Sequence, residues 1–365
     1  MGLECGIVGL PNVGKSTLFN TLTNAEVPAE NFPFCTVDPH RGVVPVPDPR
    51  LEELSAIVNP EKVVPTLMTF VDIAGLVKGA SAGEGLGNQF LSHIREVHAI
   101  AHVVRCFRDE NIIHVMGEPN PKRDIEIIDL ELCLSDLDTI KKRLDKIERS
   151  AKAGNAEAKT EVEFIKIAME SLNEGISLRR IKSKLEGFPL DGFLTSKPVI
   201  YVANMAESEI KNPSAEAKTW LADVQKIADL DRALVIPMSV SLEQQLSQLS
   251  EDDRKVFQEE YGIKEPALHR FIREAYKALG LITFFTAGVK EVRAWTVRKG
   301  GLAPDAAGEI HTDFKKGFIR AETIAFSDYI AQKGEKGAKE KGLQRSEGKE
   351  YVVADGDVIL FRFAV

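Results

Sequence analysis

Apolar residues in the first part of the chain gather in short runs that end at glycine or polar residues. The segment ECGIVGLPNVGKSTLFNTL predicts a short apolar strand, a glycine-bearing turn and then a helix. The segments LMTFVDIAG and PVIYVANM predict two further buried strands. Because helical sequence separates these strands, the pattern favours an α/β domain with a mostly parallel sheet.

A different periodicity fills the middle of the chain. Apolar residues recur at mostly three- or four-residue steps amid dense charge, in one run from Ile125 to Ile147 and in another from Val162 to Ile176. The break AGNAE at 153–157 separates the runs. This pattern predicts a long antiparallel helical hairpin, inserted into the sheet domain because strand-like sequence resumes at Pro198. Charged amphipathic helices are most often a solvated scaffold, so the hairpin alone indicates no function.

After about Tyr276, short β-rich runs alternate with Gly, Asp and Pro turns, in LITFFTAG, VRAWTV, KGFIRAETIAF and YVVADGDVILFRF. This composition predicts a small α+β domain with its own core. The expected organisation is therefore a discontinuous sheet domain at 1–125 and 198–276, an inserted hairpin at 126–197 and a small domain at 277–365.

Composition limits the classes of protein and partner. A chain of 365 residues with 44% hydrophobic and 28% charged content is long enough for two or three domains with their own cores. Its net charge of −8 means that any RNA contact must be regional. The four cysteines are scattered without a C-x-x-C pair, which favours free thiols in a reducing compartment. With no signal-like N-terminus and no long apolar run, we expect a cytoplasmic protein that does not contact membranes. A monomer is expected as well.

The segment from Gly9 to Ser16 matches G-x-x-x-x-G-K-[ST] in the required context, with a strand before it and a helix after it. Backbone N–H groups around Asn12, Val13 and Gly14 can wrap a phosphate at the positive end of the helix. Lys15 would reach the β- and γ-phosphates, Ser16 would bind Mg²⁺, and Thr17 would meet the α-phosphate.

Two further elements fit the same kind of site. Asp72 leaves a predicted buried strand and is placed to hold Mg²⁺ through water, and Gly75 offers an N–H near the γ-phosphate. Between them and the glycine-rich loop, Thr36 in NFPFCTVDP is a candidate hydroxyl ligand for Mg²⁺. The order of glycine loop, Thr, D-x-x-G and N-x-x-[DE] is that of the GTPase-like switch proteins.

On these motifs the sequence resembles the YchF/Obg-like ATPase family, a branch of the translation-factor-related P-loop NTPases. The resemblance covers the whole chain, including GLPNVGKSTLFN, DIAGLVKGASAGEGLGNQFL, NMAE, GEIHTDFKKGFIRAE and DGDVILFRF. It implies a Ras-like G domain, an inserted helical hairpin and a C-terminal TGS domain of β-grasp-like fold. It also implies a switch protein that binds ATP and ADP, hydrolyses ATP slowly and associates with ribosomes or ribosomal RNA.

The residues for hydrolysis are incomplete by comparison with Ras-like enzymes, in which a Gln after D-x-x-G orients the attacking water. Here that position is Leu76, which cannot hydrogen-bond to water, so we expect slow turnover that relies on Lys15 and Gly75. His93 and His114 are candidates for the missing group, and the resemblance favours His114. Asn12 is a candidate ligand for potassium beside the phosphates, with a turn-forming role as the alternative.

The base-contacting segment is Asn204-Met205-Ala206-Glu207, where many guanine-selective relatives carry Asn-Lys-x-Asp. Glu207 is one methylene longer than Asp, Met205 can cover either purine, and the Asn204 amide can pair with an adenine edge. This geometry only weakens the case for guanine as the bound base, and the family resemblance is what favours adenine. A GTPase of the same architecture, or a nucleotide-stabilised RNA-binding scaffold without functional turnover, remain the alternatives.

A candidate RNA or ribosome surface lies in VKEVRAWTVRKGG. It combines Arg293, Arg298 and Lys299 with Trp295, and basic residues beside an aromatic suit RNA backbone contact plus base stacking. The alternative is an ordinary solvated sheet face with Trp295 in the core.

Overall fold

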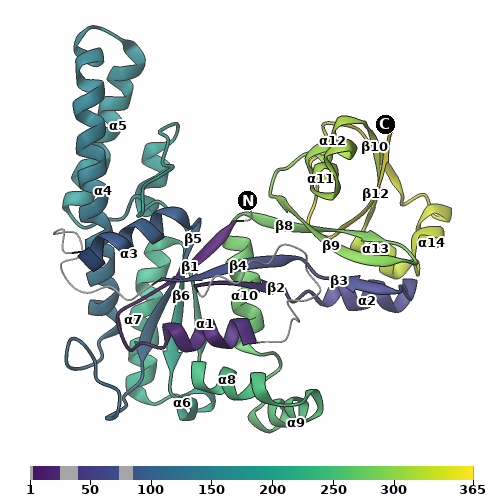
Figure 1. Ribbon diagram of the computed structural model, residues 1–365, viewed down its shortest axis with the longest axis horizontal. Coiled ribbons are helices and arrows are strands. Elements are labelled where there is room, and N and C mark those ends of the chain that lie inside the picture. The colour runs from purple at the N-terminus through teal and green to yellow at the C-terminus, as the bar shows by residue number, and fades with distance from the viewer. Residues whose placement is uncertain (1–2, 25–39, 74–84, 365) are drawn as a thin grey trace. The chain divides into compact units, whose positions relative to one another are not determined.

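The computed structural model describes residues 3–24, 40–73 and 85–364. They form two compact units (Figure 1). The first unit contains Met1–Val44 and Thr69–Ala275, and the second contains Pro45–Met68 and Tyr276–Val365.

The first unit is built on a six-stranded sheet of the described residues. Its order is β2 (Arg41–Pro45), β4 (Leu67–Asp72), β1 (Glu4–Val8), β5 (Ala99–Cys106), β6 (Val199–Met205) and β7 (Leu234–Met238). The pairs from β4 through β1, β5 and β6 to β7 are all parallel, which confirms the predicted sheet type. Every residue of β5 and β6 is buried, as expected for parallel strands covered on both faces.

Helices connect these strands and begin at side chains that cap their free N–H groups. Ser214, Ser239 and Ser250 accept hydrogen bonds from the first turns of α7 (Ala215–Asp231), α8 (Val240–Gln248) and α9 (Glu251–Tyr261). The helices of this sheet domain are α1 (Lys15–Asn24), α3 (Gly85–Glu96), α6 (Glu207–Lys211), α7 (Ala215–Asp231), α8 (Val240–Gln248), α9 (Glu251–Tyr261) and α10 (Ala267–Ala278).

The predicted hairpin consists of α4 (Pro121–Lys152) and α5 (Ala156–Asn173), followed by a 3₁₀ segment, η3 (Leu178–Leu185). Figure 1 shows α4 and α5 side by side. Asn120 and Asn155 cap the two helices. Their apolar stripes meet in one cluster, which η3 and the segment after it complete, formed by Cys133, Leu137, Ile140, Ile165, Ala168, Leu172, Leu178, Ile181, Leu185, Phe188 and Phe193.

Buried ion pairs fix the base of this hairpin. Arg179 of η3 donates to Asp129 of α4 at 2.5 Å, and Arg180 donates to Asp231 of α7 at 2.5 Å. Asp231 also accepts from the hydroxyl of Tyr201 in β6 at 2.5 Å. Burial by itself raises the pKa of Asp231, but the neighbouring arginines and Tyr201 leave it below its usual value. The carboxylate thus stays charged, and it ties the hairpin to the sheet.

The second unit has its own six-stranded sheet of described residues, in the order β11 (Arg345–Glu347), β10 (Phe318–Ala325), β12 (Asp357–Phe363), β8 (Leu281–Ala287), β9 (Glu291–Arg298) and β3 (Lys62–Val64). The pair β12–β8 is parallel, and it lies between the antiparallel pairs β10–β12 and β8–β9. This order fits the β-grasp-like domain expected at 277–365. Its helices are α2 (Pro49–Val58), α11 (Ala303–Ile310), α12 (Thr312–Lys316), α13 (Phe326–Ala331) and α14 (Glu335–Glu340).

The organisation differs from the expected boundaries at residues 45–68, which the sequence pattern assigns to the first domain. These residues belong to the second unit. β3 pairs in parallel with β9, and Leu51 and Leu54 of α2 pack in one core cluster with Phe285. The sequence of a three-residue strand does not indicate which sheet the strand joins. The apolar pattern therefore could not predict that residues 45–68 belong to the second unit.

Candidate functional site

The glycine-rich loop connects β1 to α1 and has positive φ at Gly9, Asn12 and Gly14. Asn12 has φ 61° and Gly14 has φ 101°. Asn tolerates this conformation better than other side-chain-bearing residues. At Gly14 a Cβ would lie 2.5 Å from Nδ2 of Asn204, so both the backbone angle and the close approach require glycine. Backbone of alternating handedness turns successive N–H groups toward one point, which makes a concavity suited to an anion.

Asn204 braces this loop from the carboxyl end of β6. Its Nδ2 donates to the Val13 carbonyl at 2.9 Å, and its Oδ1 accepts from the Val240 N–H at 3.1 Å. The side chain is buried, and it joins the loop, β6 and the start of α8. Both polar ends of the amide are therefore engaged by backbone, and the predicted pairing with an adenine edge would have to share them.

Lys15, Ser16 and Asp72 lie together at the start of α1 and the end of β4. The Lys15 ammonium donates to the Leu10 carbonyl at 2.8 Å, and burial lowers the pKa of Lys15 to about 8 although Asp72 opposes the shift. Ser16 Oγ donates to Asp72 Oδ2 at 3.2 Å. The other carboxylate oxygen, Asp72 Oδ1, is buried and accepts no hydrogen bond from the described residues. A hydroxyl beside an unsatisfied carboxylate oxygen is a donor set that fits a hard cation such as Mg²⁺.

Three predicted site residues lie outside the described residues. They are Thr36, a predicted Mg²⁺ ligand, Gly75, a predicted N–H donor, and Leu76. Their roles therefore stay predictions.

A cavity of about 420 Å³ opens beside the loop. Predicted residues that line it are Asn12, Gly14, Thr17, Asn204, Met205 and Glu207. Its other walls were not predicted, and they are formed by Phe107, Arg108, Asp109, Ile112, Val240 and Ser241. These residues follow the carboxyl ends of β5 and β7, the edge of a parallel sheet where ligands bind. The sequence segments CFRDE and MSVS contain these wall residues other than Ile112. Their position directly after a strand was the only sequence feature that could have predicted them.

Glu207 begins α6 and is partly buried, and its Oε2 accepts from Gln245 Nε2 at 3.4 Å. Met205 is buried at the end of β6 and contributes an apolar wall. The segment predicted to select the base therefore places a partly engaged carboxylate and a buried methionine at the cavity, where a guanine-selective protein would carry Asp and Lys.

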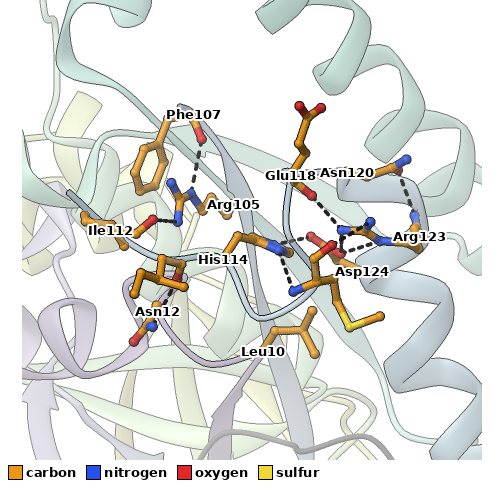
Figure 2. A network of polar contacts seen from close by, with 12 residues as sticks. Leu10, Asn12, Arg105, Phe107, Ile112, His114, Glu118, Asn120, Arg123 and Asp124 are labelled. Carbon is orange, nitrogen blue, oxygen red and sulfur yellow. Dashed lines mark hydrogen bonds and ion pairs between the residues drawn. The ribbon is translucent and has the colours of Figure 1, made fainter. Parts of the chain in front are cut away.

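His114 is buried and both its ring nitrogens have partners. Nδ1 accepts from the Met116 N–H at 3.1 Å, so Nε2 carries the proton and donates to Asp124 Oδ2 at 2.9 Å. Figure 2 shows His114 beside Asp124 and Arg123, both of α4. Its predicted action on water would require it to leave these partners. His93 is an exposed residue in the last turn of α3, and its catalytic role likewise stays a prediction.

Asn12 contacts the segment that precedes His114. Its Nδ2 donates to the Ile113 carbonyl at 3.1 Å (Figure 2). The interaction engages the amide nitrogen, and the predicted potassium contact of the amide oxygen stays a prediction.

The predicted RNA surface is divided within the second unit. Arg298 and Lys299 are exposed, and they line a cavity of about 750 Å³ with Lys315 and Lys316. Trp295 instead is partly buried and packs against a core cluster, where its ring stacks on Phe284 at 6.4 Å between centroids and its Nε1 donates to Thr286. The guanidinium of Arg293 lies over the Trp295 ring, 4.0 Å from the ring centroid. The role of Trp295 in RNA stacking therefore stays a prediction.

A parallel sheet with a phosphate loop after its first strand and a carboxylate at the end of a neighbouring strand defines a P-loop NTPase of the GTPase fold. A family model described as 50S ribosome-binding GTPase matches residues 4–162, and the YchF-GTPase_C model, described as a protein of unknown function, matches residues 281–364.

Whole-chain relatives narrow this class. The chain is 53% identical to the ribosome-binding ATPase YchF of Escherichia coli O157:H7 and 50% identical to that of Bacillus subtilis (strain 168), covering 100% of each chain. The solved structure of the Schizosaccharomyces pombe YchF GTPase matches with a TM-score of 0.86 at 38% identity, covering 99% of this chain and 98% of that one. The chain belongs to the YchF family. None of its described helices is long and apolar enough to cross a membrane.

The lowered pKa of Lys15 predicts that triphosphate affinity depends on pH. Without nucleotide, Lys15 loses its charge as the pH rises through about 8, while a bound phosphate favours the charged form. Affinity should therefore fall above that pH, by up to about tenfold per pH unit. Calorimetric titration with Mg-ATP between roughly pH 7 and pH 9 measures this effect. Lys15→Arg should show a flat profile because Arg stays charged, and a flat profile for the unmodified protein would contradict the assignment.

Proposed function

We propose that this protein is an ATP-dependent molecular switch that hydrolyses ATP slowly and associates with ribosomes. The observation that carries the nucleotide part is the braced loop beside an unsatisfied Asp72 oxygen, next to a cavity of suitable size for a base. The full-length relatives named ribosome-binding ATPase support the activity and the partner.

Ser16 and Asp72 are the described residues that would hold Mg²⁺, with Thr36 as a further predicted ligand. When bound, the ion would neutralise charge that develops on the phosphate oxygens. Lys15 would exchange its bond to the Leu10 carbonyl for the β- and γ-phosphate oxygens. Its buried position makes this exchange favourable, because a buried ammonium is better neutralised by an anion than by a carbonyl.

Slow turnover follows from Leu76 at the position where Ras-like enzymes carry a water-orienting Gln. Gly75 would supply an N–H, and His114 or His93 would supply the missing polar group after a rearrangement. Asn12 would contribute an amide oxygen to potassium beside the phosphates. The switch output would be the conformation of the loops around these residues.

The choice of base depends on the segment at the end of β6. The bacterial relatives are named ATPases, whereas the Schizosaccharomyces pombe structure is named a GTPase, so the names alone do not decide. Glu207 replaces the Asp that pairs with the two guanine donors, and its carboxylate has Gln245 as a neighbour. Met205 and Phe107 offer apolar walls that accept either purine. The balance favours adenine, with a GTPase of the same architecture as the alternative.

The ribosome contact is proposed for the basic residues of the second unit. Arg298, Lys299, Lys315 and Lys316 surround one cavity, although Lys315 is paired with Asp305 at 2.8 Å. Such a cluster suits phosphates of RNA more than a protein partner. The remaining alternative is a scaffold whose nucleotide only stabilises the fold. Lys15→Ala distinguishes it, because a scaffold would keep its ribosome association when triphosphate binding is lost.

For the base, ATP should bind more tightly than GTP by about 1–3 kcal/mol, the scale of one bidentate base contact. The double variant Glu207→Asp with Met205→Lys should narrow this gap, because it restores the guanine-pairing carboxylate and the covering lysine. Calorimetry of the purified protein with ATP, ADP, GTP and GDP measures it. Equal or tighter GTP binding by the unmodified protein would support the GTPase alternative.

For the ribosome, Arg298→Glu with Lys299→Glu should weaken co-sedimentation and reduce its salt dependence, because fewer counterions are released from phosphates. The matched control is Lys336→Glu with Lys339→Glu, which makes the same charge change on exposed residues of α14. The same binding curves for both variants at several salt concentrations would exclude this surface.

A further inference from the structure

Arg105, near the end of β5, is a buried cation whose hydrogen bonds go to backbone. Its side chain is among the largest that are fully buried, and the residue is 1% exposed. Its Nε donates to the Phe107 carbonyl at 3.2 Å, Nη1 to the Ile112 carbonyl at 2.9 Å, and Nη2 to the Asp109 carbonyl at 3.2 Å. The guanidinium also lies 4.6 Å from the centre of the Phe107 ring.

Burying a charge without a bonded carboxylate is costly, and it is tolerated where the hydrogen bonds are well placed. The planar guanidinium has donors that point in several fixed directions, whereas a lysine ammonium is a compact point charge. Here those donors reach three carbonyls from one short segment, residues 107–113, which we call the wall loop. The wall loop is thus curled around a single side chain (Figure 2).

The outer side of the wall loop borders the nucleotide cavity. Phe107, Arg108, Asp109 and Ile112 all line it. The Ile113 carbonyl accepts the bond from Asn12, so the wall loop also contacts the phosphate loop. Directly after it, His114 bonds Asp124 and thereby fastens the end of the wall loop to α4.

We infer that Arg105 is a positioning residue for nucleotide binding, which holds the wall loop in the shape that closes the base cavity. The inference rests on the proposed function, because it takes the cavity to be the site of the base. Arg108 also lines the cavity, but its guanidinium pairs with Glu216 of α7 at 2.8 Å. The hydrogen bonds described for Arg108 do not reach a carbonyl of the wall loop. Among the described residues, Arg105 is the side chain that bonds three carbonyls of the wall loop.

The first test is Arg105→Lys, measured with the purine triphosphate that the unmodified protein binds more tightly. Losing the forked contacts should raise its Kd about tenfold or more, the effect of about one charged hydrogen bond. The control is Arg143→Lys, which alters an arginine of the hairpin that bonds Glu161 and covers the Phe188 ring. The control should leave Kd within about twofold of the unmodified protein. A folded Arg105→Lys variant with unchanged Kd would overturn the inference.

Hydrogen exchange of the unmodified protein supplies a second test that does not depend on the variant folding. Addition of the same nucleotide should slow exchange of wall-loop amides several-fold, because the nucleotide packs against them. If hydrogen exchange of the wall-loop amides stays unchanged while that of the phosphate-loop amides slows, the inference that the wall loop closes the base cavity is overturned and the proposed nucleotide binding is not. Failure of the unmodified protein to bind either purine triphosphate would instead overturn the proposed function. A preference for GTP would correct only the base, since both tests use the tighter nucleotide.

Discussion

The side-chain amide of Asn204 is the interaction on which the site depends. It bonds both the Val13 carbonyl of the phosphate loop and the Val240 N–H of α8, two groups that lie far apart in the sequence. Its closeness excludes any side chain at position 14, and so it explains why the loop needs glycine there. Because β6 is buried along its whole length, the amide is carried by a rigid strand. The loop is therefore shaped before any phosphate arrives, which lowers the entropy cost of binding.

The electrostatics of the site fit an anion and a cation that arrive together. Lys15 is buried with a carbonyl as its hydrogen-bond acceptor, and Asp72 keeps one buried oxygen without a described donor. Both groups lose hydration without full compensation, and such groups are common at functional sites. A phosphate would satisfy the lysine, and a metal ion would satisfy the carboxylate. These two groups thus favour the ligands proposed for the site.

Much of this arrangement could be predicted from the sequence, because it is encoded by local patterns. The phosphate loop, the strand before it, the helix after it and the two hairpin helices follow from glycine spacing and apolar periodicity. Residues 45–68 could not be assigned, since sheet partners are a property of the whole fold. The burial of Asp129 and Asp136 on α4 was equally hidden, because their partners Arg179 and Thr195 lie far along the chain. The wall loop was missed because Arg105 acts through carbonyls, which every residue carries.

The central claim is that Asn204 holds the phosphate loop ready for a triphosphate. It is tested most directly by calorimetry of Mg-ATP binding to Asn204→Ala, with Asn212→Ala as the control on an exposed asparagine just after α6. The variant leaves two buried backbone groups unpaired, each costing about 1–3 kcal/mol, so the affinity should fall at least about tenfold while the control matches the unmodified protein. A folded Asn204→Ala variant that binds Mg-ATP as tightly as the unmodified protein would contradict the account.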